Sequence, residues 1–73
     1  MYDKERFARA VYKSGLKKRY ISRQLGLAYD TFLKKSNGVV EWKISEALKV
    51  SKVLGITKAE RDSIFFAQEV HNM

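Results

Sequence analysis

The chain has 73 residues, of which 45% are hydrophobic, 12% aromatic and 32% charged, the composition of one small globular domain over residues 1–73 and not of a disordered tail. It has no cysteine and a single histidine, His71, which excludes disulfides and thiolate zinc sites, so we expect no metal or other cofactor. No apolar run is long enough to form a leader or to span a membrane, and a cytoplasmic protein is expected.

Apolar residues recur at helical spacing in five segments, and four of the segments end at a glycine, the residue that most often stops a helix. We expect helices over about residues 3–14, 18–25, 29–36 and 44–54, and a fifth after Thr57. Thr57 and Glu60 have the spacing of a capping box, in which each side chain satisfies a backbone amide at the helix start. Strand alternation is absent from these segments, so the sequence predicts an all-α domain with short loops.

The helical spacing also predicts which side chains form the core. The residues expected to face inward are Phe7, Ala10, Val11, Ser14, Ile21, Leu25, Phe32, Ile44, Ala47, Leu48, Ser51 and Leu54. Trp42 lies in a short connection and is expected to pack onto this core, whereas Tyr12 and Tyr20 are expected to be half-buried.

The charges are distributed unevenly along the chain. Residues 1–36 contain ten of the 15 Lys and Arg residues but only three of the eight Asp and Glu residues, whereas residues 37–73 are balanced. The first half therefore carries the entire formal net charge of +7. Such a field attracts a polyanion, of which nucleic acid is the commonest. An acidic protein surface also fits, and a solvated basic face is the alternative that needs no partner.

The segment GLKKRYISRQLGLAYDTFLKKSNG, residues 15–38, contains two short expected helices separated by a Leu25-Gly26-Leu27 turn. The apolar residues spaced to lock these helices at a steep angle, as a helix-turn-helix requires, are Ile21, Leu25, Leu27 and Phe32. The spacing resembles the helix-turn-helix of the XRE family, the Cro and repressor type of temperate phages, at about residues 17–36. The likeness extends over residues 7–66, and it implies a compact five-helix domain that binds operator DNA, usually as a dimer.

The resemblance places the start of the recognition helix at about Ala28. The residues expected to read bases, or to contact a partner protein, are Tyr29, Asp30, Thr31, Leu33 and Lys34. Lys34 suits guanine, and Asp30 can accept a hydrogen bond only from cytosine or a bridging water. Tyr29 suits a phosphate and Leu33 a thymine methyl group. This mixture departs from a usual base-reading face, and the alternatives are packing residues or a protein-binding patch.

A second set of residues is expected to hold the DNA backbone. The residues expected to contact phosphates are Lys17, Lys18, Arg19, Arg23, Lys35, Asn37 and Lys43, and the resemblance implies this role for Lys18 and for the Asn37-Gly38 loop with its backbone amides. The second, third and fourth helices begin after Lys17, Ala28 and Lys43, whose side chains cannot accept a bond from the free amides. Lysines beside such helix starts favour anions. Sequence drift is the alternative, as is a later start of the fourth helix capped by Ser45.

These observations favour a small phage-type transcriptional regulator that binds double-stranded operator DNA and acts by occluding a promoter. The alternative is an antirepressor or modulator that uses the same fold to bind and block, or to co-operate with, a phage repressor protein. No nucleophile–base pair, carboxylate dyad or phosphate-binding glycine loop is present. We therefore expect no catalytic residue, no enzymatic activity and no small-molecule substrate.

A chain this short buries only a small core, and association with another subunit is the expected further source of stability. Phe65 and Phe66 are adjacent, so one helix cannot bury both against the same neighbour. One of them is expected in the core. The other is expected to contact a second copy of the chain, with coverage of the region near Val70 as the alternative.

Overall fold

Five helices and their connections account for residues 2–66, the part of the chain that the computed structural model describes. The helices are α1 (Lys4–Ser14), α2 (Lys18–Leu25), α3 (Tyr29–Ser36), α4 (Ile44–Leu54) and α5 (Lys58–Phe65). Residues 2–66 contain no strand, so the expected all-α class is confirmed. The helix bounds also agree with the expected segments. The residues that start and stop a helix act on backbone groups only a few residues away, so the sequence is enough to predict them.

The helix ends follow those local signals. The Asp3 side chain accepts a bond from the Arg6 amide at 3.0 Å and caps α1. Thr57 and Glu60 form the expected capping box at α5, with the Glu60 amide 3.1 Å from the Thr57 hydroxyl. The last helical turns of α1, α2 and α4 each run into a glycine with positive φ. The end of α3 is different, because Asn37 is its C-cap and Gly38 follows one residue later.

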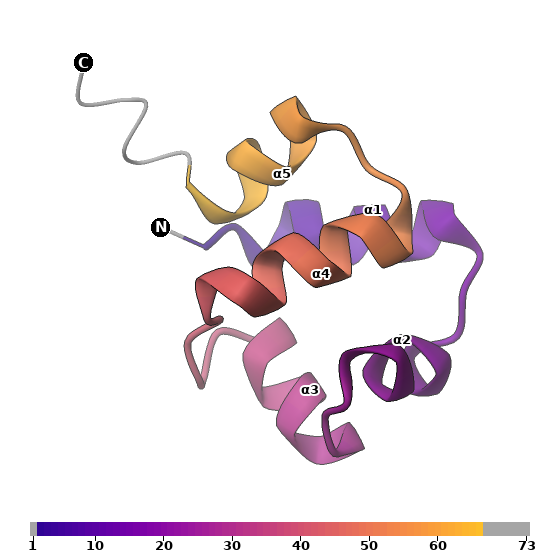
Figure 1. The fold of residues 1–73 in the computed structure, drawn as a ribbon. Helices are drawn as coiled ribbons and strands as arrows, with labels where there is room; N and C mark the ends of the chain where they lie inside the picture. The colour runs from indigo at the N-terminus through magenta and orange to yellow at the C-terminus, as the bar shows by residue number, and fades with distance from the viewer. Residues whose placement is uncertain (1, 67–73) are drawn as a thin grey trace.

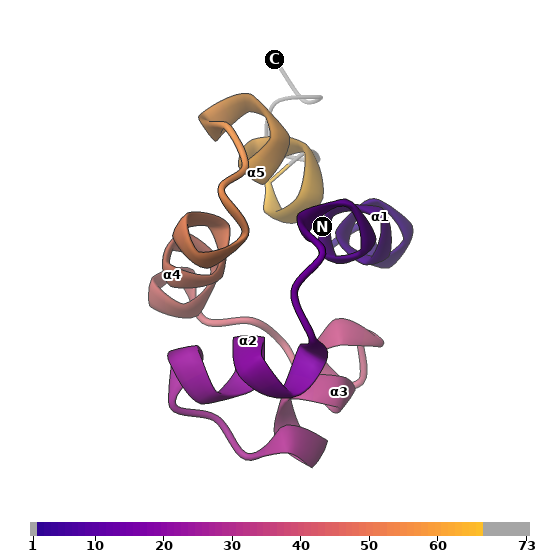
Figure 2. The same cartoon turned by 90° about the vertical axis from the view of Figure 1, so that its right-hand side faces the viewer.

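The helices are arranged in three levels. α1 and α4 cross the middle of the domain, α5 lies at one end, and α2 and α3 lie at the other (Figures 1 and 2). The Asp3 amide donates to the Ile64 carbonyl at 2.7 Å and so ties the start of α1 to α5. The α2–α3 pair forms the end of the domain opposite α5 (Figures 1 and 2).

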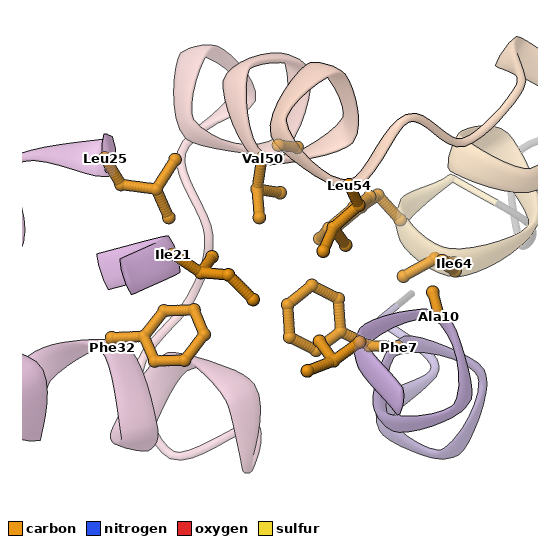
Figure 3. Packing of buried hydrophobic residues seen from close by; sticks show 11 residues of the cluster. Phe7, Ala10, Ile21, Leu25, Phe32, Val50, Leu54 and Ile64 are labelled. Atoms are coloured by element: carbon orange, nitrogen blue, oxygen red, sulfur yellow. The ribbon is translucent and has the colours of Figure 1, made fainter. Parts of the chain in front are cut away.

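One apolar core fills the space between the levels, and its side chains point toward a common centre (Figure 3). The buried members are Phe7, Ala10, Val11, Ile21, Leu25, Phe32, Ala47, Val50, Leu54, Ile64 and Phe65. The expected packing of Trp42 is confirmed, since its ring centroid lies 5.3 Å from that of Phe7 and 5.5 Å from that of Phe65. The core thus draws on all five helices and on the α3–α4 connection.

Tyr2 also packs against this core, although it was not among the residues expected to face inward. Its ring stacks on Phe65 at 5.6 Å, and its hydroxyl donates to the Ser36 carbonyl at 2.7 Å. Burial raises the pKa of this hydroxyl. An apolar residue just before the N-cap that meets the fourth helical residue forms a hydrophobic staple, and Tyr2 before Asp3 has that relation to Phe7. The spacing of Tyr2, Asp3 and Phe7 could therefore have predicted the burial of Tyr2 from the sequence.

Four expectations about burial are wrong. Ile44 and Leu48 are 68% and 39% exposed, because α4 is rotated so that Val50, which is 0% exposed, takes the inward position. Tyr12 and Tyr20 are not half-buried but 88% and 44% exposed, since each lies on the side of its helix away from the core. Helical spacing gives the period of a buried face, and only the packing of neighbours sets its centre.

Candidate functional site

The candidate site is the end of the domain that α2 and α3 form, opposite α5 (Figures 1 and 2). Only Gly26, Leu27 and Ala28 separate the two helices. Gly26 has φ 71°, a left-handed conformation that lets the next amide, that of Leu27, donate to the Ser22 carbonyl at 3.0 Å. The turn therefore fixes the direction in which α3 leaves α2.

α3 has one buried face and one exposed face. Phe32 and Lys35, three residues apart, are 0% and 5% exposed and hold the helix to the body. Asp30 and Lys34, four residues apart, are exposed on another face, and Thr31 beside them is half-buried. The polar surface that α3 offers to another molecule is thus one carboxylate, one ammonium group and part of one hydroxyl.

The apolar half of the expected outward patch is only partly exposed, which favours the alternative that Tyr29 and Leu33 are packing residues. Leu33 is half-buried and packs against the core. Tyr29 is also half-buried, and the Arg19 guanidinium lies 4.2 Å from the centroid of its ring. This cation–π contact joins α2 to α3. Both apolar side chains therefore serve the positioning of α3 and have little surface left for a partner.

Positive charge is concentrated along α2. The α2 cation row consists of Lys17, Lys18, Arg19 and Arg23, all exposed. No Asp or Glu occurs from residue 6 to residue 29, and within residues 2–66 no member of the row forms an ion pair. The row is thus positive charge that no neighbouring carboxylate neutralises.

The starts of α2 and α3 have no side-chain cap, as expected from Lys17 and Ala28. Their first-turn amides are free to donate to an anion, and the helix dipole adds partial positive charge. The start of α4 differs, because the Lys43 amide donates to Glu46 Oε1 at 2.9 Å. α4 begins at Ile44, so the alternative start capped by Ser45 is wrong.

The expected phosphate contact at Lys35 is wrong. Its ammonium nitrogen lies 2.9 Å from Glu46 Oε1 and donates to the Glu41 carbonyl, also at 2.9 Å. Burial of Glu46 opposes its ionisation, but the bonds from Lys43 and Lys35 outweigh burial and lower the pKa of Glu46. Lys35 thus ties the end of α3 to the start of α4. Its position three residues after Phe32 placed it on the inward face already in the sequence.

The loop after α3 offers fewer donors than expected. The Asn37 and Gly38 amides donate to the Leu33 and Lys35 carbonyls at 2.9 and 3.1 Å, so these amides are not free for phosphate. The side chains of Asn37 and Lys43 are exposed and remain able to make such contacts. The loop contribution is therefore limited to these two side chains.

The two phenylalanines at the end of α5 have different surroundings. Phe65 is 8% exposed and is the member of the pair that belongs to the core, as expected of one of them, so it is not available as a dimer contact. Phe66 is half-buried, with its ring centroid 6.3 Å from that of Phe65. His71 and Val70 lie outside the described residues. Phe66 alone of the pair can contact a second chain.

Within residues 2–66 no three His, Cys, Asp or Glu side chains are grouped to hold a metal ion. No described helix is long and apolar enough to cross a membrane. Comparisons of the chain with protein-family models, with curated proteins and with solved structures give no match. The function must therefore be inferred from the geometry and charge of the α2–α3 end.

Proposed function

We propose that this chain is a sequence-specific transcriptional regulator that binds double-stranded operator DNA through a helix-turn-helix of the XRE type, formed by α2, its turn and α3. The observation that carries the proposal is the placement of the exposed face of α3 beside the α2 cation row, at one end of the domain. Ile21, Leu25 and Phe32 hold α2 and α3 to the core, and the opposite faces of both helices are exposed at this end.

The dimensions of α3 suit the major groove. An α-helix with its side chains is about 10–12 Å in diameter, and the major groove is about 12 Å wide, so the groove can admit α3. With Phe32 facing the body, Asp30 and Lys34 would face the base edges. Lys34 would donate to guanine, and Asp30 would accept from the cytosine amino group.

The α2 cation row would hold the DNA backbone. Lys17 and Lys18 flank the uncapped start of α2, where free amides and the helix dipole both favour a phosphate. One face of the Arg19 guanidinium lies on the Tyr29 ring, so Arg19 would contact phosphate only through the edge of the guanidinium group. These contacts give affinity and position without sequence information. Discrimination between sequences therefore depends on α3.

The experiment is fluorescence anisotropy with duplexes from around the chain's own gene, measured over a salt series against a scrambled duplex. We expect Lys34→Ala to weaken specific binding and to relax one base position. Lys18→Ala should weaken all duplexes alike and reduce the slope of log affinity against log salt by about 1. Lys49→Ala, at an exposed lysine of α4, is the matched control and should change neither quantity. Equal effects of Lys18→Ala and Lys34→Ala on specific and scrambled DNA would refute base reading by α3.

The second candidate is an antirepressor that binds a phage repressor through α3. Asp30 supports it, because an exposed carboxylate at the centre of the face repels phosphates. The half-burial of Tyr29 and Leu33 argues against it, because these side chains were to supply the apolar part of the interface. Binding that is salt-sensitive and identical on all duplexes, together with capture of the repressor encoded nearby, would favour the second candidate.

A further inference from the structure

An apolar strip lies on the surface of α4 and on the loop before it. The α4 strip consists of Val39, Val40, Ile44 and Leu48, which are 72%, 39%, 68% and 39% exposed. Within residues 2–66 the other exposed large apolar side chains, Tyr12 and Tyr20, lie on α1 and α2. A contiguous apolar surface on a small soluble domain usually marks a contact with another molecule.

The strip borders a groove of about 480 Å³ between α4 and the end of α5. Ile44 and Val40 line one side of this groove, and Phe66 lies on its wall. The groove and the strip are therefore one surface, into which side chains from a second molecule can pack. The half-exposed Phe66 belongs to that surface.

We propose that the α4 strip is the interface between two copies of this chain. The distribution of charge favours a second copy as the occupant. All of the net charge of +7 lies in residues 1–36, so two copies that met through that half would repel each other. Residues 37–73, which contain the strip, have no net charge. Association here keeps the two α2 cation rows out of the contact.

The strip is also complementary to itself. Ile44 and Leu48 are four residues apart and form one ridge of α4, which Lys52 continues toward the end of the helix. Glu41 lies in the connection three residues before Ile44, and both residues line the groove, so Glu41 is near the other end of the ridge. Both Glu41 and Lys52 are exposed, and neither forms an ion pair within the described part of the chain. The ridge thus has an acidic end, an apolar middle and a basic end.

A two-fold axis near residue 46 brings these parts together. The two α4 helices then run antiparallel, and each Ile44 meets the partner's Leu48. Each Glu41 meets the partner's Lys52 at the two ends of the contact. Interdigitation of the two ridges corresponds to the commonest class of helix packing in globular proteins. The charged ends are exposed and individually weak, so the apolar middle supplies the affinity. The complementarity of the charged ends fixes the antiparallel direction.

The test is sedimentation velocity of the full chain without DNA, from about 1 μM to about 1 mM, the range in which weak dimers form. The wild-type chain should self-associate, and Ile44→Asp and Leu48→Glu should each raise the dimer dissociation constant about tenfold or more. Both positions are exposed, so the thermal melts monitored by circular dichroism should stay close to wild type. Tyr12→Asp is the matched control at the most exposed aromatic residue and should leave association unchanged.

Charge reversal tests the direction of packing. Glu41→Lys or Lys52→Glu alone should weaken association, and the double variant Glu41→Lys/Lys52→Glu should restore it. A wild-type chain that is monomeric throughout, or association that neither Ile44→Asp nor Leu48→Glu weakens, overturns the interface. Failure of the double variant to restore association overturns the antiparallel arrangement. None of these readouts involves DNA, so the interface stands or falls separately from the proposed function.

Discussion

Replacement of Lys35 by Met tests the assignment of this residue to the fold and not to the DNA. The Lys35 and Glu46 side chains are 6% and 15% exposed, and their charged groups are 2.9 Å apart. Removal of one partner from a buried ion pair costs about 3–5 kcal/mol. Glu46 keeps some exposure and the bond from the Lys43 amide, so we expect about 2–3 kcal/mol for Lys35→Met. For a domain of this size the loss corresponds to a fall in Tm of about 10–20 °C.

The measurement is urea and thermal unfolding followed by circular dichroism. Lys34→Met is the matched control, because Lys34 is next to Lys35 in the chain but is exposed. This substitution should change the free energy of unfolding by less than about 0.5 kcal/mol. The double variant Lys35→Met/Glu46→Gln should recover much of the loss. Glutamine leaves no unpaired charge and can still accept from the Lys43 amide.

A free energy of unfolding of Lys35→Met within about 0.5 kcal/mol of wild type would show that Lys35 does not stabilise the fold. A simultaneous reduction of the salt slope of DNA binding by about 1 would return Lys35 to the phosphate contacts first expected from the sequence. A double variant less stable than Lys35→Met would show that Glu46 stabilises the fold mainly as a cap of α4.

Three further predictions concern the turn, a cap and the pH dependence. Gly26→Ala should lower the free energy of unfolding by about 1 kcal/mol, because φ 71° is strained for alanine while the added Cβ meets no atom within 4 Å; an unchanged urea midpoint would contradict this. Thr57→Ala should remove the capping box of α5 and cost about 1 kcal/mol, whereas Thr31→Ala should cost less in the same melts, because α3 has no side-chain capping bond. The lowered pKa of Glu46 means that its contribution to stability is complete above the ordinary glutamate range and is lost as pH falls through the lowered pKa. The acid-induced loss of stability should therefore be smaller in Glu46→Gln, and parallel pH profiles would count against the pair.

The starts and ends of the helices could be predicted from local sequence signals. Asp3, Thr57 and the glycines after α1, α2 and α4 act on amides and carbonyls within a few residues, so their effect can be read without knowledge of the neighbours. The placement of Phe32 in the core and of Asp30 and Lys34 outside follows from the 3.6-residue period for the same reason.

The rotation of each helix, and the residues that cover its other faces, depend on packing between helices and could not be predicted from the sequence. Ile44 and Val50 both fit a helical apolar face, and the neighbours of α4 select Val50 for the core. Tyr29 looked free until Arg19, ten residues earlier, was placed over its ring. The helical period places Lys35 on the side of Phe32, but only the packing brings Glu46 of α4 and the Glu41 carbonyl of the α3–α4 connection to its ammonium group. Burial and charge pairing depend on residues distant in the chain, so a local pattern predicts an exposed face only until packing assigns it neighbours.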